Sequence, residues 1–148
     1  MAEGRDKQTL DPASFTLRYE DAVPSSTERI EAVCEMVRRL AQETALAESE
    51  RTNVEIALRE ALANAIIHGN EEDPGKKVHV RCWCDPGRGV LIGVSDQGLG
   101  FLPDEVPDPT SGTGLERASG RGLFLMRRLM DRVEFREGGT EVLFFKAV

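Results

Sequence analysis

The sequence lacks a long apolar run, an excess of basic residues and a matched set of cysteines, and each absence excludes a class of protein. No stretch reaches the roughly 18 apolar residues of a membrane-spanning helix, and the first residues, MAEGRDKQTLDPAS, have no apolar core typical of a secretory signal. The net charge of -7 argues against a general nucleic-acid binder, which needs a basic surface to displace counterions from phosphates. We therefore expect a cytoplasmic protein that contacts no membrane and no nucleic acid directly.

The three cysteines, Cys34, Cys82 and Cys84, cannot all pair within one chain, which fits a reducing compartment. Cys82 and Cys84 flank Trp83, and on a strand both would point to the same face as small apolar side chains. Without a second Cys or His pair they do not supply the four ligands of a structural zinc site. We expect them to belong to the hydrophobic core.

A length of 148 residues suits one compact domain, and hydrophobic periodicity predicts its elements. We expect residues 1–13 to form a disordered tail and residues 14–148 to form the folded domain. The alternation of Phe15, Leu17 and Tyr19 with polar residues predicts a first strand with one buried face. The later patterns predict, in order, helices over 27–44 and 48–68, a hairpin over 78–84 and 90–96, a long irregular segment over 97–119, a helix over 123–131 and a hairpin over 132–148.

The second predicted helix carries an unusual line of polar residues in the stretch 59-REALANAIIHGNEE-72. Residues four apart on a helix stand about 40° apart around its axis, so Glu60, Asn64 and His68 would form one polar ridge. Small alanines beside the ridge would let a ligand or another backbone approach closely. An exposed ridge on an amphipathic helix explains the same pattern without any function, so neighbouring motifs must decide between the two.

Two glycine motifs follow. In 96-DQGLGF-101 a carboxylate ends an apolar strand and two glycines follow at alternate positions, so Asp96 could accept a hydrogen bond from an exocyclic amine of a flat ligand. In 120-GRGLFLM-126 glycines open a helix whose exposed N–H groups and positive dipole end favour an anion. Each motif alone is also compatible with an ordinary loop or helix entry. No P-loop pattern occurs in the chain, which excludes that class of ATPases.

Taken in order, E-x-x-x-N on a helix, D-x-G-x-G after a strand, a long segment and G-x-G at a helix start resemble the nucleotide-binding boxes of the GHKL ATPase superfamily, which includes gyrase, Hsp90, histidine kinases and MutL. The chain is most similar to free-standing anti-sigma-factor serine/threonine kinases of the RsbW and SpoIIAB type, through EALANAIIHGN, SDQGLGF, LERASGRGLFLM, LMDRV and GGTEVLFFK. The resemblance covers the chain from Phe15 onward. It implies the Bergerat ATP-binding fold, an α/β (α+β) two-layer sandwich with helices on one face of a mixed, mostly antiparallel sheet and a long ATP lid near residues 102–119.

The resemblance also implies roles for single residues. Glu60 would be the general base, and Asn64 would bind Mg²⁺, which prefers few protein oxygens together with phosphate oxygens and waters. Asp96 would hydrogen-bond the adenine amino group. The remaining cofactor-binding residues implied by the resemblance are Gly98, Gly100, Gly120, Arg121, Gly122, Leu123 and Thr140.

A lid arginine that reaches the γ-phosphate in the family corresponds to Arg117. Ala118 is an extra residue between this arginine and the second glycine box, so Arg121, inside the box, is an alternative for the same contact. His68 has no role in the family pattern. A histidine at the end of a helix, near the negative end of its dipole, is the simpler interpretation, and contact with the lid or phosphate is the other.

Three functions fit the resemblance. The first is an ATP- and Mg²⁺-dependent serine/threonine kinase that phosphorylates a small STAS-type antagonist and sequesters a sigma factor, as a homodimer. The second is an ATP-responsive binding module that switches a partner without phosphotransfer, which the altered spacing around Ala118 would favour. The third is the catalytic domain of a histidine kinase, which would need a phospho-acceptor histidine on another polypeptide.

Overall fold

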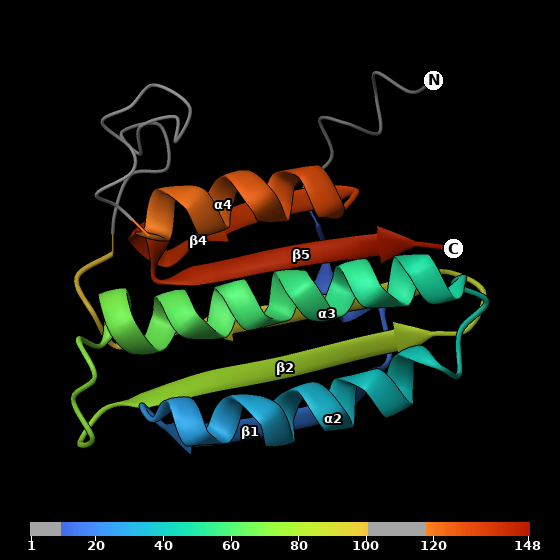
Figure 1. Cartoon of the computed structure of the whole chain (residues 1–148). Helices are drawn as coiled ribbons and strands as arrows, with labels where there is room; N and C mark the ends of the chain where they lie inside the picture. Colours follow the sequence, from blue (N-terminus) through green and yellow to red (C-terminus); the bar gives the residue numbers. More distant parts are fainter. Residues whose placement is uncertain (1–9, 101–117) are drawn as a thin grey trace.

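The computed structural model describes residues 10–100 and 118–148, which form a five-stranded sheet covered on one face by helices (Figure 1). The strands are β1 (Leu17–Pro24), β2 (Lys77–Asp85), β3 (Gly89–Ser95), β4 (Arg132–Arg136) and β5 (Glu141–Ala147). Their spatial order is β1-β2-β3-β5-β4, and all four pairings among these strands are antiparallel. The expected two-layer sandwich with a mostly antiparallel sheet is confirmed.

The helices α2 (Ile30–Ala41), α3 (Glu48–Ala63) and α4 (Ala118–Leu129) lie side by side on one face of the sheet (Figure 1). A short 3₁₀ turn, Thr27–Arg29, leads into α2, and the Ser26 hydroxyl caps it by accepting a hydrogen bond from the N–H of Glu28 at 3.3 Å. This cap fixes the start of the first helical segment, which the sequence predicted from residue 27 onward.

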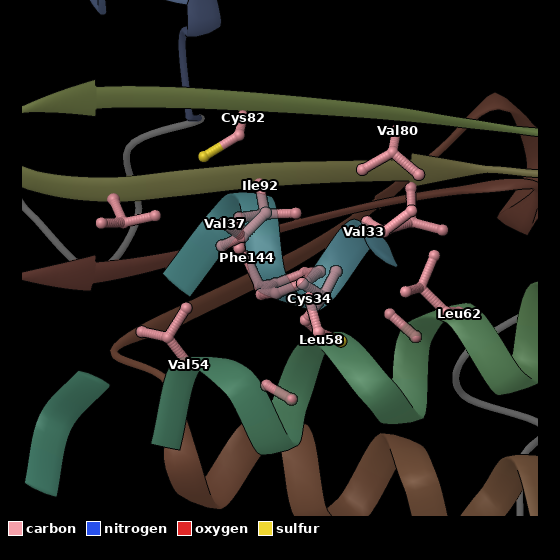
Figure 2. Packing of buried hydrophobic residues seen from close by; sticks show 14 of the residues in the cluster. Val33, Cys34, Val37, Val54, Leu58, Leu62, Val80, Cys82, Ile92 and Phe144 are labelled. Carbon is pink, nitrogen blue, oxygen red and sulfur yellow. The ribbon is translucent and has the colours of Figure 1, made fainter. Parts of the chain in front are cut away.

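The hydrophobic core lies between these helices and the sheet. Val33 and Val37 of α2 and Leu58 of α3 are fully buried against alternate residues of the central strands, among them Ile92 and Phe144 (Figure 2). Their helical spacing and the period of two along the strands direct one face of each element inward. This packing fixes α3, and with it the polar ridge, over the middle of the sheet.

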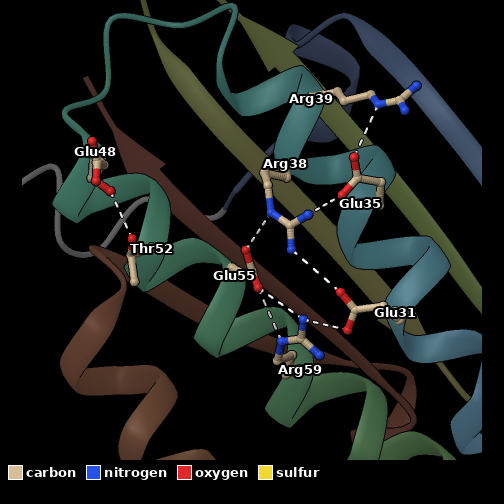
Figure 3. Close-up of polar contacts among 8 residues, drawn as sticks. All are labelled: Glu31, Glu35, Arg38, Arg39, Glu48, Thr52, Glu55 and Arg59. Carbon is tan, nitrogen blue, oxygen red and sulfur yellow. Dashed lines mark hydrogen bonds and ion pairs between the residues drawn. The ribbon is translucent and has the colours of Figure 1, made fainter.

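A network of ion pairs joins α2 to α3 at the solvent-facing side of this layer (Figure 3). Arg38 on α2 contacts Glu55 on α3 at 2.9 Å, and Arg59 on α3 contacts Glu31 on α2 at 2.8 Å. Arg38 also pairs with Glu35 on its own helix. The hydrogen bond from Arg38 holds the pKa of Glu55 below its ordinary value, so this contribution to stability is present at neutral pH and is lost on acidification.

The first strand differs from its prediction. It begins at Leu17 rather than Phe15, and a bulge between Leu17 and Tyr19 sends their side chains to opposite faces of the sheet. Tyr19 packs against the core, whereas Leu17 pairs with Trp83 on the helix-free face and is 46% exposed. The simple alternation of Phe15, Leu17 and Tyr19 on one buried face is therefore wrong, because the bulge breaks the period of two.

The end of the expected tail is docked on the helix-free face of the sheet. Leu10 is only 6% exposed and packs in a second apolar cluster with Trp83, Leu91 and Leu143. Its backbone N–H donates to Glu134 at 2.8 Å, and its carbonyl accepts a hydrogen bond from Arg136. Residues 10–13 thus belong to the folded unit, because an apolar side chain covers the tryptophan; residues 1–9 lie outside the described part of the chain.

All three cysteines are buried and free, as expected for core positions. Burial raises the pKa of the Cys82 thiol to about 12, so it remains protonated and unreactive at neutral pH. Among the residues described, no helix combines the length and the apolar character required to cross a bilayer.

We predict that Leu10→Ala will lower the free energy of unfolding by about 2 kcal/mol, since it removes a buried side chain from the apolar cluster. Trp83 is the only tryptophan, so its fluorescence reports this face directly. Its emission should shift to longer wavelength in the folded variant. Met36→Ala, at a partly exposed position on α2, is the control and should leave the emission unchanged. An unshifted spectrum for Leu10→Ala would contradict the docking of this segment.

Candidate functional site

A cavity of about 570 Å³ opens between the C-terminal end of α3, the end of β3, helix α4 and the β4–β5 hairpin. Its polar lining includes Asn64 and Asp96. Its apolar walls come from Ala61, Ala65, Val94, Leu123, Met126, Phe135 and Val142. A cavity of this size with apolar walls and a few polar groups is typical of a small-molecule or cofactor site.

The helix that lines the cavity does not continue as an α-helix to His68. It changes at Asn64 into a π-helical segment, Asn64–Gly69, and the N–H of Asn70 bonds to the carbonyl of Ala65 at 2.8 Å. In a π-helix each N–H bonds to the carbonyl five residues earlier, which widens the turn. Residues four apart therefore no longer lie above one another as they do on an α-helix. The ridge predicted from the sequence is regular between Glu60 and Asn64 and is distorted beyond them. His68 lies on the exposed side of this segment and lines the cavity.

The turn after β3 packs against the end of this π-helical segment. A Cβ placed on Gly98 would lie 2.1 Å from the carbonyl oxygen of Gly69, and a Cβ on Gly69 would lie 2.3 Å from Oδ2 of Asp96. Only glycine allows this approach, because a real Cβ never comes so close to another heavy atom. The contact brings the Asp96 carboxylate to the cavity wall beside Gly69.

The second glycine of the D-x-G-x-G motif meets the β4–β5 hairpin. Gly100 has φ +81°, and a Cβ there would lie 2.1 Å from the carbonyl oxygen of Gly138 and 3.3 Å from Cγ2 of Thr140. The N–H of Asp96 donates to the carbonyl of Thr140 at 2.9 Å. Thr140, predicted as part of the site from a distant part of the chain, therefore borders the same turn as Asp96.

At the other end of the cavity, α4 approaches α3 through a glycine. A Cβ on Gly122 would lie 2.7 Å from Nδ2 of Asn64 and 3.0 Å from Oε2 of Glu60. The side chains of Glu60 and Asn64 thus converge on the same point of α4. This arrangement places the Glu60 carboxylate and the Asn64 amide together. Asn64 lies five residues before Gly69, where the helical segment contacts Asp96.

The Asp96 carboxylate is half buried, and its environment is asymmetric. Burial raises the pKa of Asp96 above its ordinary value, while the N–H of Gly98, which donates to Oδ1 at 2.8 Å, and the charge of Lys76 oppose this rise. Within the described residues no hydrogen bond engages Oδ2. Asp96 can therefore accept a hydrogen bond from a ligand that enters the cavity.

The structure brings together most of the residues that the sequence predicted. Asn64, Asp96, Gly98, Gly100, Leu123 and Thr140 line one cavity, and Glu60 and Gly122 meet at its edge. Gly120 and Arg121, like Gly122, lie inside α4, which begins at Ala118, so this motif forms the first turns of the helix instead of preceding it. Arg117 and most of the expected lid lie outside the described residues, as does the side chain of Arg121.

Sequence reasoning missed several residues of this site. Gly69 directly follows the helix predicted over 48–68 and was given no role, but its lack of a side chain makes room for Asp96. Glu71 and Lys76, between the helix predicted over 48–68 and the strand predicted over 78–84, also line the cavity. Phe135 and Gly139 of the β4–β5 hairpin do so as well. Only the dipeptide Gly69-Asn70 at the helix end was a sequence signal, and it does not by itself distinguish a stop from a contact.

The donor set of the cavity limits which metal it could hold. Among the described residues there is no group of three or more His, Cys, Asp or Glu side chains placed to ligate a metal. The amide of Asn64, with the Glu60 carboxylate beside it, offers oxygen atoms of the kind that Mg²⁺ uses when phosphates and waters complete its shell.

Comparison with known proteins agrees with this geometry. The model of the histidine kinase-like ATPase domain family matches residues 23–146. The chain is 36% identical over 103 residues to the anti-sigma F factor of Oceanobacillus iheyensis, covering 66% of this chain and 69% of that protein. It is 42% identical over 98 residues to the anti-sigma F factor of Heyndrickxia coagulans, covering 62% and 65%, and 36% identical over 104 residues to that of Clostridium perfringens, covering 66% and 72%.

We predict that Gly98→Ala will disrupt the cavity, because its Cβ would collide with the backbone of Gly69, which cannot rotate away. Such overpacking costs about 1–3 kcal/mol of unfolding free energy, and the affinity for a fluorescent ATP analogue should fall at least about tenfold. Gly87→Ala is the matched control, because a Cβ at Gly87 meets nothing within 4 Å. Equal affinities for the two variants would argue against the packing described here.

Asp96→Asn tests whether the buried Asp96 carboxylate lowers the free energy of unfolding while it contributes to ATP binding. The raised pKa of Asp96 means that its ionised form is disfavoured in the folded protein, so the substitution should increase the free energy of unfolding at neutral pH. This gain should vanish as the pH falls below the ordinary pKa of an aspartate, where both states bind the proton. ATP affinity should decrease about 10- to 100-fold. Denaturant unfolding at several pH values and ATP titration measure both effects; a destabilised variant would contradict the electrostatic account.

Proposed function

Because this chain belongs to the histidine kinase-like ATPase domain family, we propose that it is an ATP-dependent serine/threonine protein kinase that acts as an anti-sigma factor. It transfers the γ-phosphate of ATP to a serine or threonine of a small STAS-type antagonist, and it sequesters a sigma factor when the antagonist is phosphorylated. Support comes from the relatives named anti-sigma F factor and from the convergence of Glu60 and Asn64 on Gly122.

The cavity suits an adenine nucleotide in both shape and polarity. Its apolar walls can hold a flat base, and Oδ2 of Asp96 can accept a hydrogen bond from the exocyclic amine. In the proposed pose the phosphates extend from Asp96 along the helix toward Asn64. There they meet the N-terminal turns of α4, whose N–H groups and dipole favour an anion, with Gly120, Gly122 and Leu123 in this region.

Glu60 and Asn64 supply the groups for phosphotransfer in this proposal. The oxygen of the Asn64 amide would hold Mg²⁺, which when bound neutralises negative charge on the phosphates. The Glu60 carboxylate accepts the proton of the attacking hydroxyl while that oxygen bonds to the γ-phosphorus and ADP leaves. A carboxylate in this position favours a hydroxyl acceptor, because a histidine acceptor needs no base of this kind.

The protein partners are a finer part of the same proposal. The sigma factor is supported by the names of the relatives, and the antagonist is implied by the family resemblance alone. For a homodimer, β1 has only β2 beside it among the described strands, and a second copy could pair with its outer edge. The proposed location is the cytoplasm, where such regulators of transcription act.

The decisive experiment is phosphotransfer from Mg-ATP to a STAS-type antagonist protein, with Glu60→Gln as the test variant. A missing general base should reduce the rate at least about 100-fold while ATP affinity stays within a factor of about two. Glu48→Gln, an exposed glutamate at the start of the same helix, is the control and should transfer phosphate normally.

Two outcomes would contradict different parts of this proposal. Transfer by Glu60→Gln at the wild-type rate would leave the kinase activity in place and contradict the role of Glu60 as general base. ATP binding by the wild type, with the mass of the antagonist unchanged after incubation, would instead indicate a nucleotide-responsive binding module without phosphotransfer.

A further inference from the structure

Asn70, which directly follows the π-helical segment, is fully buried and hydrogen-bonded to three separate parts of the chain. Its Nδ2 donates to the hydroxyl of Ser25 at 2.7 Å and to the carbonyl of Lys77 at 3.0 Å. Its Oδ1 accepts the N–H of Gln97 at 2.7 Å. Burying an amide is costly unless its polar atoms are paired, and here both its oxygen and its nitrogen are.

The bond to Gln97 is the one that reaches the cavity. Gln97 lies between Asp96, whose carboxylate lines the cavity, and Gly98, whose N–H holds that carboxylate. The side chain of Gln97 is also fixed, because its Oε1 accepts the N–H of Lys77 at 2.7 Å. Asn70 and Lys77 therefore both bind Gln97, the middle residue of the Asp96 turn, and neither of them lines the cavity.

The same residue fixes the helix on which the turn rests. The N–H of Asn70 closes the π-helical segment by bonding to Ala65, and its carbonyl accepts the N–H of Asp73 at 3.0 Å. Gly69, the immediate neighbour of Asn70, is the residue against which Asp96 and Gly98 pack. Asn70 thus connects both sides of the contact that orients the Asp96 carboxylate.

We propose that Asn70 is a positioning residue for nucleotide selection: through Gln97 it holds the Asp96 carboxylate where it accepts the adenine amine. The inference rests on the proposed function, in which the cavity binds ATP. A carboxylate in the right place attracts the amine of adenine and repels the carbonyl that guanine carries at the same position. If the carboxylate is free to move, the preference for ATP over GTP should decrease, while the other contacts between the cavity and the nucleotide remain.

The test compares ATP and GTP affinities, by calorimetry, in the wild type and in three variants. Asn70→Ala removes the acceptor for Gln97, and the preference for ATP over GTP should fall about tenfold. Asn70→Asp keeps an acceptor for the Gln97 N–H but places a carboxylate against the carbonyl of Lys77. It should be less stable yet keep the wild-type preference within about a factor of two.

Ser25→Ala is the matched control, because it removes a different bond of the same Asn70 side chain and leaves the bond to Gln97 intact. It should lower stability and keep the preference for ATP. A purely structural role for Asn70 would make nucleotide preference follow stability in all three variants, whereas a positioning role separates Asn70→Ala from the other two.

The outcomes distinguish this inference from the proposed function. A wild type that binds neither nucleotide overturns both, whereas a wild type that binds ATP and GTP equally well overturns only the inference. A wild type that prefers ATP, with an equal preference in Asn70→Ala, overturns only the role of Asn70. A further measurement needs no folded variant: in the nucleotide-free wild type, the Gln97 amide should exchange with D₂O far more slowly than an unstructured amide, and unprotected exchange would also overturn the inference.

Discussion

The cavity depends on one contact, in which the turn after β3 lies directly against the end of the helical segment Asn64–Gly69. Gly98 approaches the carbonyl of Gly69, and Gly69 in turn leaves space for the carboxylate of Asp96. A side chain at either glycine would separate the two segments. Because the helix carries Asn64 and the turn carries Asp96, this contact sets the relative position of the two polar groups that line the cavity.

The rest of the fold supports that contact from both sides of the sheet. The apolar core and the Arg38 and Arg59 ion pairs hold α3 over the central strands. On the helix-free face, Leu10 covers Trp83 and its cluster, so the sheet is packed on both surfaces. A rigid sheet matters for function because Asp96 directly follows β3 and Thr140 directly precedes β5, and these neighbouring strands bring both residues to one edge of the cavity.

Local sequence patterns were sufficient where one short segment decides the structure. The hairpins, the helix cap at Ser26 and the inward cysteines follow from periodicity and capping chemistry, which depend on residues close together in the chain. The bulge after Leu17 and the π-helical turn at Asn64 were not predictable in this way. Each inserts one residue into the period of a regular element. Whether such an insertion is favourable depends on packing against segments that are distant in the sequence.

The sequence by itself determined the order of the elements, the polar pair Glu60 and Asn64 on one helix and the glycine motifs, since spacing along the chain defines all of them. Only the tertiary structure showed why glycine is required at these positions. Gly98 packs against Gly69, Gly100 against Gly138 and Gly122 against Asn64, each too closely for a Cβ. The tertiary structure alone also showed that Asn70 joins the helix end to the turn that carries Asp96. Such contacts join residues far apart in sequence, and no local periodicity encodes a distance between them.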